Sequence, residues 1–129
     1  MNPSTMPFTL LILLIVCHFV ADYCLTTPQM LAAKASGKRL HHIVLHAGVH
    51  AVLMGIVFLI YGTDLQLVAI LFSIELVSHF VIDYMKGLAG RCFPACADVK
   101  KKAFWVVYGL DQLLHLLVIV AMVWVTTKA

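Results

Sequence analysis

The segment LQLVAILFSIELVSHFVIDYM, residues 65–85, combines the two features on which the fold depends. It is long and apolar enough to cross a bilayer as a helix, which takes about 20 residues. Within it, Glu75, His79 and Asp83 recur at intervals of four residues, so they lie on one face of that helix. Ionisable side chains inside a membrane are energetically costly, and each is therefore a candidate functional residue.

Three further segments have the same apolar character, at about residues 7–25, 43–61 and 103–125. Together the four spans predict an all-α integral membrane protein, a four-helix bundle with antiparallel up-down topology in a single domain over residues 1–129. The connection 62–64 is so short that the spans on either side of it must form a hairpin. The composition agrees, because 63% hydrophobic and only 12% charged residues exclude a soluble globular domain, a disordered chain and a basic nucleic-acid-binding domain.

The basic residues predict the orientation of the spans. Eight of the nine Lys and Arg residues lie in the connections 26–42 and 86–102, and the ninth is Lys128. Since basic loops favour the cytoplasmic side, both connections are expected in the cytoplasm and both termini outside. Cys92 and Cys96 then lie in a reducing compartment, where a disulfide is not expected.

Each of the other three spans also carries ionisable residues four positions apart. The pairs are His18 and Asp22, His46 and His50, and Asp111 and His115. Because neighbouring spans are antiparallel, all the stripes are expected at similar depth, in the cytoplasmic half of the bilayer. One such pair is a weak signal, but stripes on four helices predict that these side chains meet in the core of the bundle.

The chemistry of the stripes points to a metal site. Neutral imidazoles carry no positive charge, so a divalent cation would offset the buried carboxylates. The expected ligands are His18, Asp22, His46, His50, His79, Asp83, Asp111 and His115. Mixed imidazole and carboxylate ligands suit one or two ions of Zn²⁺, or else Mn²⁺ or Fe²⁺. A metal-free polar network or proton relay remains open, as does a purely structural hydrogen bond for His50 and Glu75.

The stripes belong to four motifs: His18-Phe19-x-x-Asp22-Tyr23, Leu45-His46, His79-Phe80-x-Ile82-Asp83-x-x-Lys86 and Asp111-Gln112-x-x-His115. These motifs resemble those of a family of short integral membrane proteins from bacteria and phages, a domain of unknown function. This resemblance covers nearly the whole chain and implies the bacterial inner membrane. With the orientation expected from the basic residues, the termini would be periplasmic and the site would face the cytoplasm. Where this chain has Thr26, the family usually has Gln. The stripes are also similar to those of LexA-regulated, membrane-bound, metal-dependent hydrolases and, more distantly, to zinc-dependent phospholipase C, which implies hydrolysis of a phosphoester.

These features together predict a metal-dependent hydrolase that acts on a lipid-linked or amphipathic phosphoester from the cytoplasmic leaflet. Glu75 or Asp111 is expected to accept the proton of the attacking water. Lys86 and Lys34 are expected at the cytoplasmic mouth, where they would attract an anionic headgroup. The expected partners are the lipid bilayer and a second copy of the chain, which would help to shelter the site, whereas nucleic acid is not expected.

Two other classes of protein remain open. A metal-ion or proton transporter or channel would need a polar route through both halves of the membrane, and the outer half offers only small residues such as Cys17, Gly55 and Ser73. A structural phage or bacterial membrane protein would not need an ionisable cluster confined to one leaflet.

Overall fold

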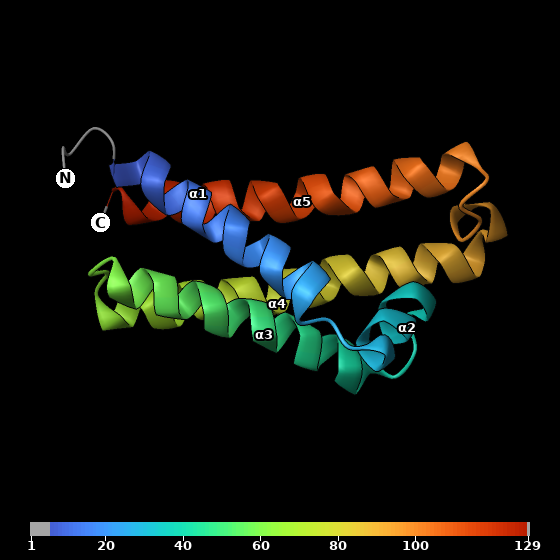
Figure 1. Ribbon diagram of the computed structural model, residues 1–129, viewed down its shortest axis with the longest axis horizontal. Helices are drawn as coiled ribbons and strands as arrows, with labels where there is room; N and C mark the ends of the chain where they lie inside the picture. Colours follow the sequence, from blue (N-terminus) through green and yellow to red (C-terminus); the bar gives the residue numbers. More distant parts are fainter. Residues whose placement is uncertain (1–5, 129) are drawn as a thin grey trace.

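The computed structural model of the chain describes residues 6–128, in which all regular elements are helical. The long helices are α1 (Met6–Phe19), continued by the π-helical turn η1 (Val20–Cys24), then α3 (Leu40–Ile60), α4 (Leu65–Cys92) and α5 (Lys102–Thr126). Successive long helices run in opposite directions, so the start of α1, the end of α5 and the α3–α4 turn lie at one end of the bundle (Figure 1). The structure thus confirms the all-α, four-span architecture.

The four long helices are candidate transmembrane segments. The stretches Pro7–Cys24, Leu40–Ile60, Leu65–Cys92 and Lys102–Thr126 are long and apolar enough to cross a membrane. Their outer faces carry many exposed large apolar side chains, such as Ile60, Leu65 and Trp124. An apolar surface of this extent is typical of contact with lipid and indicates a multi-pass membrane protein. The main difference from the expected spans is that α4 continues beyond residue 85 to Cys92.

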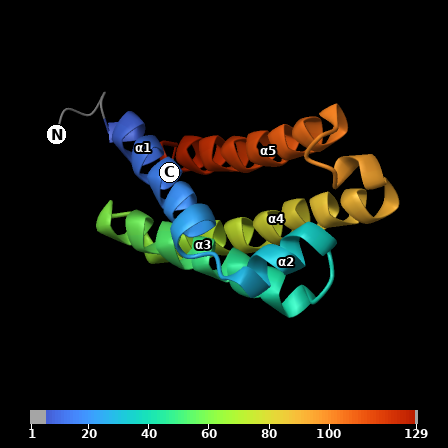
Figure 2. The ribbon, with the colours of Figure 1, turned by 45° about the vertical axis from the view of Figure 1, so that its right-hand side comes forward.

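A short helix, α2 (Pro28–Ser36), lies where only a connection was expected. Thr27 caps its start by accepting a hydrogen bond from the Met30 backbone at 3.3 Å, and Pro28 occupies its first turn. Gly37 ends it in the left-handed conformation, with φ of 59°. The sequence therefore carries the usual start and stop signals of a helix here. In the bundle, α2 packs beside α3 and α4, at the end opposite the α3–α4 turn (Figure 2).

A contact between two backbones fixes α2 against α4. A Cβ added at Gly87 of α4 would overlap the Gly37 backbone nitrogen and would lie 2.7 Å from the Lys34 carbonyl oxygen. Only a glycine at position 87 lets the two helices approach this closely. Because Lys34 is on α2, this contact also determines where the Lys34 side chain enters the bundle.

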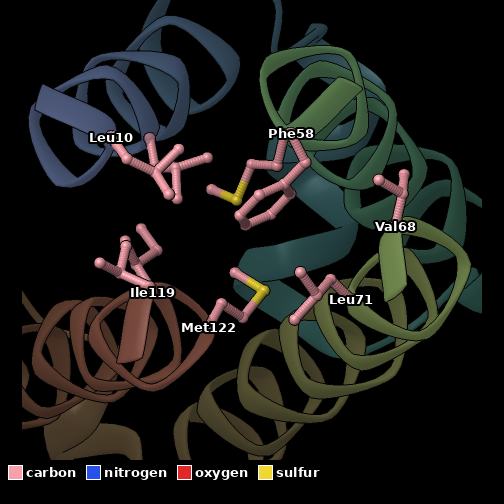
Figure 3. Packing of buried hydrophobic residues seen from close by; sticks show 9 residues of the cluster. Leu10, Phe58, Val68, Leu71, Ile119 and Met122 are labelled. Atoms are coloured by element: carbon pink, nitrogen blue, oxygen red, sulfur yellow. The ribbon is translucent and has the colours of Figure 1, made fainter. Parts of the chain in front are cut away.

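The interior of the bundle is divided into two halves. Toward the α3–α4 turn it is filled by apolar side chains that interdigitate from all four long helices (Figure 3): Leu10, Leu14, Met54, Phe58, Val68, Leu71, Ile119, Met122 and Val123. Toward α2 it buries ionisable side chains: His18, Lys34, His46, His50, Glu75, His79, Asp83, Asp111 and His115. The polar stripes of the four spans therefore do face one another, as the spacing predicts.

The close contact at Gly87 can be tested by adding one methyl group. Gly87→Ala is expected to lower the midpoint of thermal unfolding in detergent, because overpacking a tight contact costs about 1–3 kcal/mol. It should also make residues 28–37 easier to cleave in limited proteolysis. Gly90→Ala is the matched control on the same helix, since its Cβ would meet neighbours only at 3.6 Å. Equal midpoints for the two variants would contradict the backbone contact.

Candidate metal centre

Five histidine rings from the four long helices meet in the polar half. The ring centroids of His50 and His79 are 3.7 Å apart, and those of His79 and His115 are 4.1 Å apart. His46 and His18 lie on either side, with centroids 4.7 Å and 4.9 Å from that of His50. All five side chains are buried. The imidazoles therefore form one cluster and not four separate polar faces.

The carboxylates of Asp22 and Asp83 lie among these rings. Asp22 Oδ1 is 3.6 Å from His50 Nε2, and Asp22 Oδ2 is 3.5 Å from His18 Nε2. Asp83 Oδ2 is 3.5 Å from His79 Nε2. These distances are longer than good hydrogen bonds. They are close to the separation of about 3.3 Å expected for two ligands of one tetrahedral ion with bonds of about 2.0–2.1 Å.

Two groups of side chains could each hold a metal ion. In each group the ligand atoms lie within 4.8 Å of one another: Asp22, His46, His50 and His79 in the first, and His79, Asp83 and His115 in the second. The two groups together contain six of the eight expected ligands. His18 and Asp111 are adjacent to them, through Asp22 and His115 respectively. A buried His/Asp cluster that could bind a metal is thus present, while the role of each ligand stays a prediction.

Hydrogen bonds orient two of the rings that face Asp83. His79 Nδ1 donates to Glu75 Oε1 at 3.1 Å, and His115 Nδ1 donates to the Asp111 carbonyl oxygen at 2.7 Å. The Nε2 atoms of both rings are then left as lone-pair donors. Histidines that bind metals are usually held in this way, by a carboxylate or carbonyl on the other ring nitrogen. Glu75, expected as a proton acceptor, therefore lies behind a candidate ligand.

A third ring is oriented by Thr26, a residue whose role the sequence did not indicate. The Thr26 hydroxyl donates to the Ala21 carbonyl oxygen at 3.0 Å, so its oxygen accepts from His46 Nδ1 at 3.2 Å. His46 Nε2 is then an acceptor, and it lies only 3.0 Å from Asp22 Oδ1, which is also an acceptor. Two lone pairs this close require a cation beside them.

Several buried polar atoms of the cluster lack a hydrogen-bond partner within residues 6–128. They include His79 Nε2, His115 Nε2 and Asp83 Oδ2, the atoms with which the second group would bind an ion. Buried polar atoms in folded proteins are almost always paired, and an exception calls for an explanation. An ion bound at this position would satisfy all three atoms at once.

Lys34 provides a cation inside the cluster. Its Nζ donates to Asp22 Oδ1 at 2.7 Å and to His46 Nε2 at 2.8 Å, and it lies 3.4 Å from Asp83 Oδ2. The side chain was expected at the mouth of the site, but it is buried within it. The reason is the docking of α2 on Gly87, which carries Lys34 inward. Its expected role in binding substrate stays a prediction.

Lys86 is the second cation, and it lies nearer the surface. Its Nζ donates to Asp111 Oδ2 at 2.9 Å and is 3.4 Å from Asp83 Oδ1. With neutral imidazoles, the four buried carboxylates of Asp22, Glu75, Asp83 and Asp111 exceed the two ammonium groups by two negative charges. An uncompensated charge in a buried site is unfavourable. A divalent ion would cancel these two negative charges.

The fold and the site together define a class of protein: an all-α bundle with candidate membrane helices around a buried cluster of histidines and aspartates. The chain belongs to the family described as protein of unknown function (DUF3307), which matches residues 10–129. This agrees with the resemblance seen in its motifs. No curated protein and no solved structure matches the chain.

Substitution of Lys34, the buried ammonium group of the cluster, tests the charge balance. Lys34→Met is expected to destabilise the metal-free protein by about 3–5 kcal/mol, because it leaves buried carboxylates without their partner. Zn²⁺ should then raise the unfolding midpoint more in the variant than in the wild type, since the ion replaces a missing positive charge. Lys38→Met, at an exposed lysine just after α2, is the control. If Lys34→Met were as stable as this control in the presence of a chelator, the charge argument would be wrong.

Proposed function

We propose that the chain is a membrane-embedded, metal-dependent hydrolase of phosphoesters, with one divalent ion held by His79, Asp83 and His115. The proposal rests on the three donor atoms of these residues, which are buried, close together and without hydrogen-bond partners in the described part of the chain. Two imidazoles and one carboxylate leave a coordination position open, which is typical of catalytic zinc sites. The same ligand set also accommodates Fe²⁺ or Mn²⁺.

The hydrogen bond of His79 favours one ion over two. Because His79 Nδ1 donates to Glu75, only its Nε2 lone pair is available, and one lone pair binds one ion. Both candidate groups include His79, so their full ligand sets cannot be occupied together. In the first group, Lys34 already occupies the lone pairs of Asp22 and His46. We therefore assign the ion to the second group.

The residues around this position could support hydrolysis. A bound divalent ion would polarise a phosphoryl oxygen and activate a water molecule. In the reaction, the water oxygen forms a bond to phosphorus, the bond from phosphorus to the ester oxygen breaks, and a proton of the water passes to a base. We assign Asp111 as this base, because Lys86 and Gln112 hold its Oδ2 at 2.9 Å and 3.0 Å while its Oδ1 has no partner among residues 6–128. To Glu75 we assign the orientation of His79.

The apolar half of the bundle argues against transport. A transporter or channel requires a polar route through the whole membrane. Beyond the cluster, the interior is packed with apolar side chains from all four long helices, including Leu14, Phe58 and Met122. A single copy therefore offers a polar site that is closed on one side, which suits chemistry on a substrate that enters and leaves from the same side. From the distribution of Lys and Arg, we propose that this side is the cytoplasm. The resemblance to short membrane proteins of bacteria and phages leads us to propose that the membrane is the bacterial inner membrane.

Elemental analysis of the purified protein tests the proposal directly. The wild type is expected to contain about one divalent ion per chain, and His79→Ala and Asp83→Ala should lose both the ion and the hydrolysis of phosphoesters in a substrate panel. His41→Ala, at an exposed histidine in the first turn of α3, should keep both. Retention of the ion in His79→Ala would contradict the ligand assignment. A metal-loaded wild type that hydrolyses no phosphoester, but moves metal into proteoliposomes, would contradict the hydrolase.

Substitutions of Glu75 and Thr26, which orient the rings of His79 and His46, distinguish the two candidate metal-binding groups. Glu75→Met removes the acceptor for His79 and is expected to weaken Zn²⁺ binding about 10–100-fold, the usual effect of losing such a partner. Glu75→Gln keeps an acceptor oxygen and should retain most of the affinity. Thr26→Val is the matched control, because it acts on His46, which belongs only to the first group. Competition with a chromogenic chelator measures all three, and a loss in Thr26→Val that exceeds that in Glu75→Met would move the ion to the first group.

A further inference from the structure

A cavity of about 250 Å³ lies beside the cluster, at the end of the bundle that carries α2. Its walls come from η1, α2, the end of α4, the short 3-10 helix η2 (Pro94–Cys96) and the start of α5. Asp22, Lys34 and Lys86 line it on the side of the cluster. Elsewhere its lining is largely apolar: Leu31, Ala97, Phe104 and Val107. The cavity thus joins a charged end to an apolar wall.

We infer that this cavity binds an amphipathic phosphoester, with its anionic group against Lys34 and Lys86 and its hydrocarbon chain along the apolar wall. The inference rests on the proposed function and names the substrate class of that site. Lys34 connects the cavity to the proposed metal site, because it lines the cavity and its Nζ lies 3.4 Å from Asp83 Oδ2. A phosphoryl group at the charged end would therefore be one side chain away from the proposed ion.

Lys86 has the capacity to bind an anion. An ammonium group has three N–H donors, and in Lys86 they face two carboxylate oxygens, one on Asp111 at 2.9 Å and one on Asp83 at 3.4 Å. One donor remains for a ligand, and the Lys86 side chain is 20% exposed. Lys34, by contrast, donates to two acceptors within the cluster, Asp22 Oδ1 and His46 Nε2, and is buried among them. Lys86 is therefore the first contact that we assign to the phosphate.

The charge balance couples this anion site to the metal. Without an ion, the four buried carboxylates and two lysines leave two negative charges, which disfavour a further anion. A divalent ion would cancel these two charges and so remove the repulsion. Binding of metal and of phosphoester should therefore strengthen each other, and the coupling must be reciprocal.

The position of the cavity along the helices suits a lipid-like ligand. The 28 residues of α4 span about 42 Å, more than the hydrocarbon core of about 30 Å, so one end of α4 extends into the headgroup region. That end carries Lys86 and Arg91 and forms part of the cavity. Leu31 of α2 is strongly exposed beside it, as expected for a short helix that lies in the membrane interface. A headgroup in the cavity would then lie at the depth of the surrounding lipid headgroups.

Cys96 allows the cavity to be probed without measuring activity. It lines the cavity, whereas Cys92, four residues earlier at the end of α4, is exposed and does not. A protein with Cys17, Cys24 and Cys92 changed to Ser retains Cys96 as its single thiol, and the rate of maleimide labelling in maltoside detergent reports access to the cavity. Decyl phosphate is expected to slow labelling of Cys96 several-fold, more with Zn²⁺ than with EDTA, and Lys86→Gln should remove most of this effect. Because the free Lys86 donor does not depend on the ion, weaker protection should persist in EDTA.

Three comparisons decide the result. A protein that retains only Cys92 should label at the same rate with and without decyl phosphate. Inorganic phosphate and decyl maltoside at the same concentration should protect Cys96 much less, since each supplies only half of the ligand chemistry. Equal protection by either compound, or none by decyl phosphate, would overturn the inference. Elemental analysis of the Zn²⁺-treated samples separates the two proposals: bound metal without protection contradicts the cavity ligand alone, and protection in a Zn²⁺-treated sample that contains no metal contradicts the metal centre alone.

Discussion

Three aspartates buried in one membrane bundle must find positive charge, and the polar half is arranged around that requirement. An unpaired carboxylate in an apolar medium is strongly unfavourable. Two lysines supply this positive charge: Lys34, which α2 places in the site, and Lys86 on α4. With Glu75 as a fourth buried carboxylate, these two ammonium groups leave two negative charges without a partner, in a site that also contains five imidazoles. One divalent cation would both neutralise the remaining negative charge and bind the ring nitrogens that have no partner.

The two halves of the interior have different roles: the apolar half holds the helices together, and the polar half contains the candidate site. In lipid, helices associate mainly through close packing and hydrogen bonds and not through burial from water. The apolar half, whose core cluster includes Leu10, Phe58 and Leu71, provides such packing on one side of the polar cluster. The polar half can therefore keep unpaired donor atoms and a cavity, because the bundle does not depend on that end alone for its assembly.

Much of the site follows from the four-residue spacing, because side chains four apart share a face in any helix. For that reason the convergence of His18, His46, His79 and His115 was predictable from sequence. The burial of Lys34 was not, because it depends on a backbone contact between Gly37 and Gly87, which are distant in the chain. Thr27, Pro28 and Gly37 did carry the signals for α2, but such signals do not tell where a helix docks. The role of Glu75 likewise depends on which nitrogen of His79 it contacts, a detail of ring orientation that spacing leaves undetermined.

The π-helical turn η1 has a consequence for the helical phase of the first span. Leu10, Leu14, His18 and Asp22 all turn their side chains inward although they are spaced by four. A regular helix rotates about 100° per residue, so each step of four residues overshoots a full turn by about 40°. The three steps from Leu10 to Asp22 would therefore turn Asp22 about 120° away from the direction of Leu10. The underwound turn, in which the Leu25 amide bonds to the Val20 carbonyl, takes back part of this rotation. If residues 20–24 formed a regular α-helix of the same length, Asp22 would turn further away from the direction of Leu10 and toward lipid, while the apolar contacts of α1 kept their register.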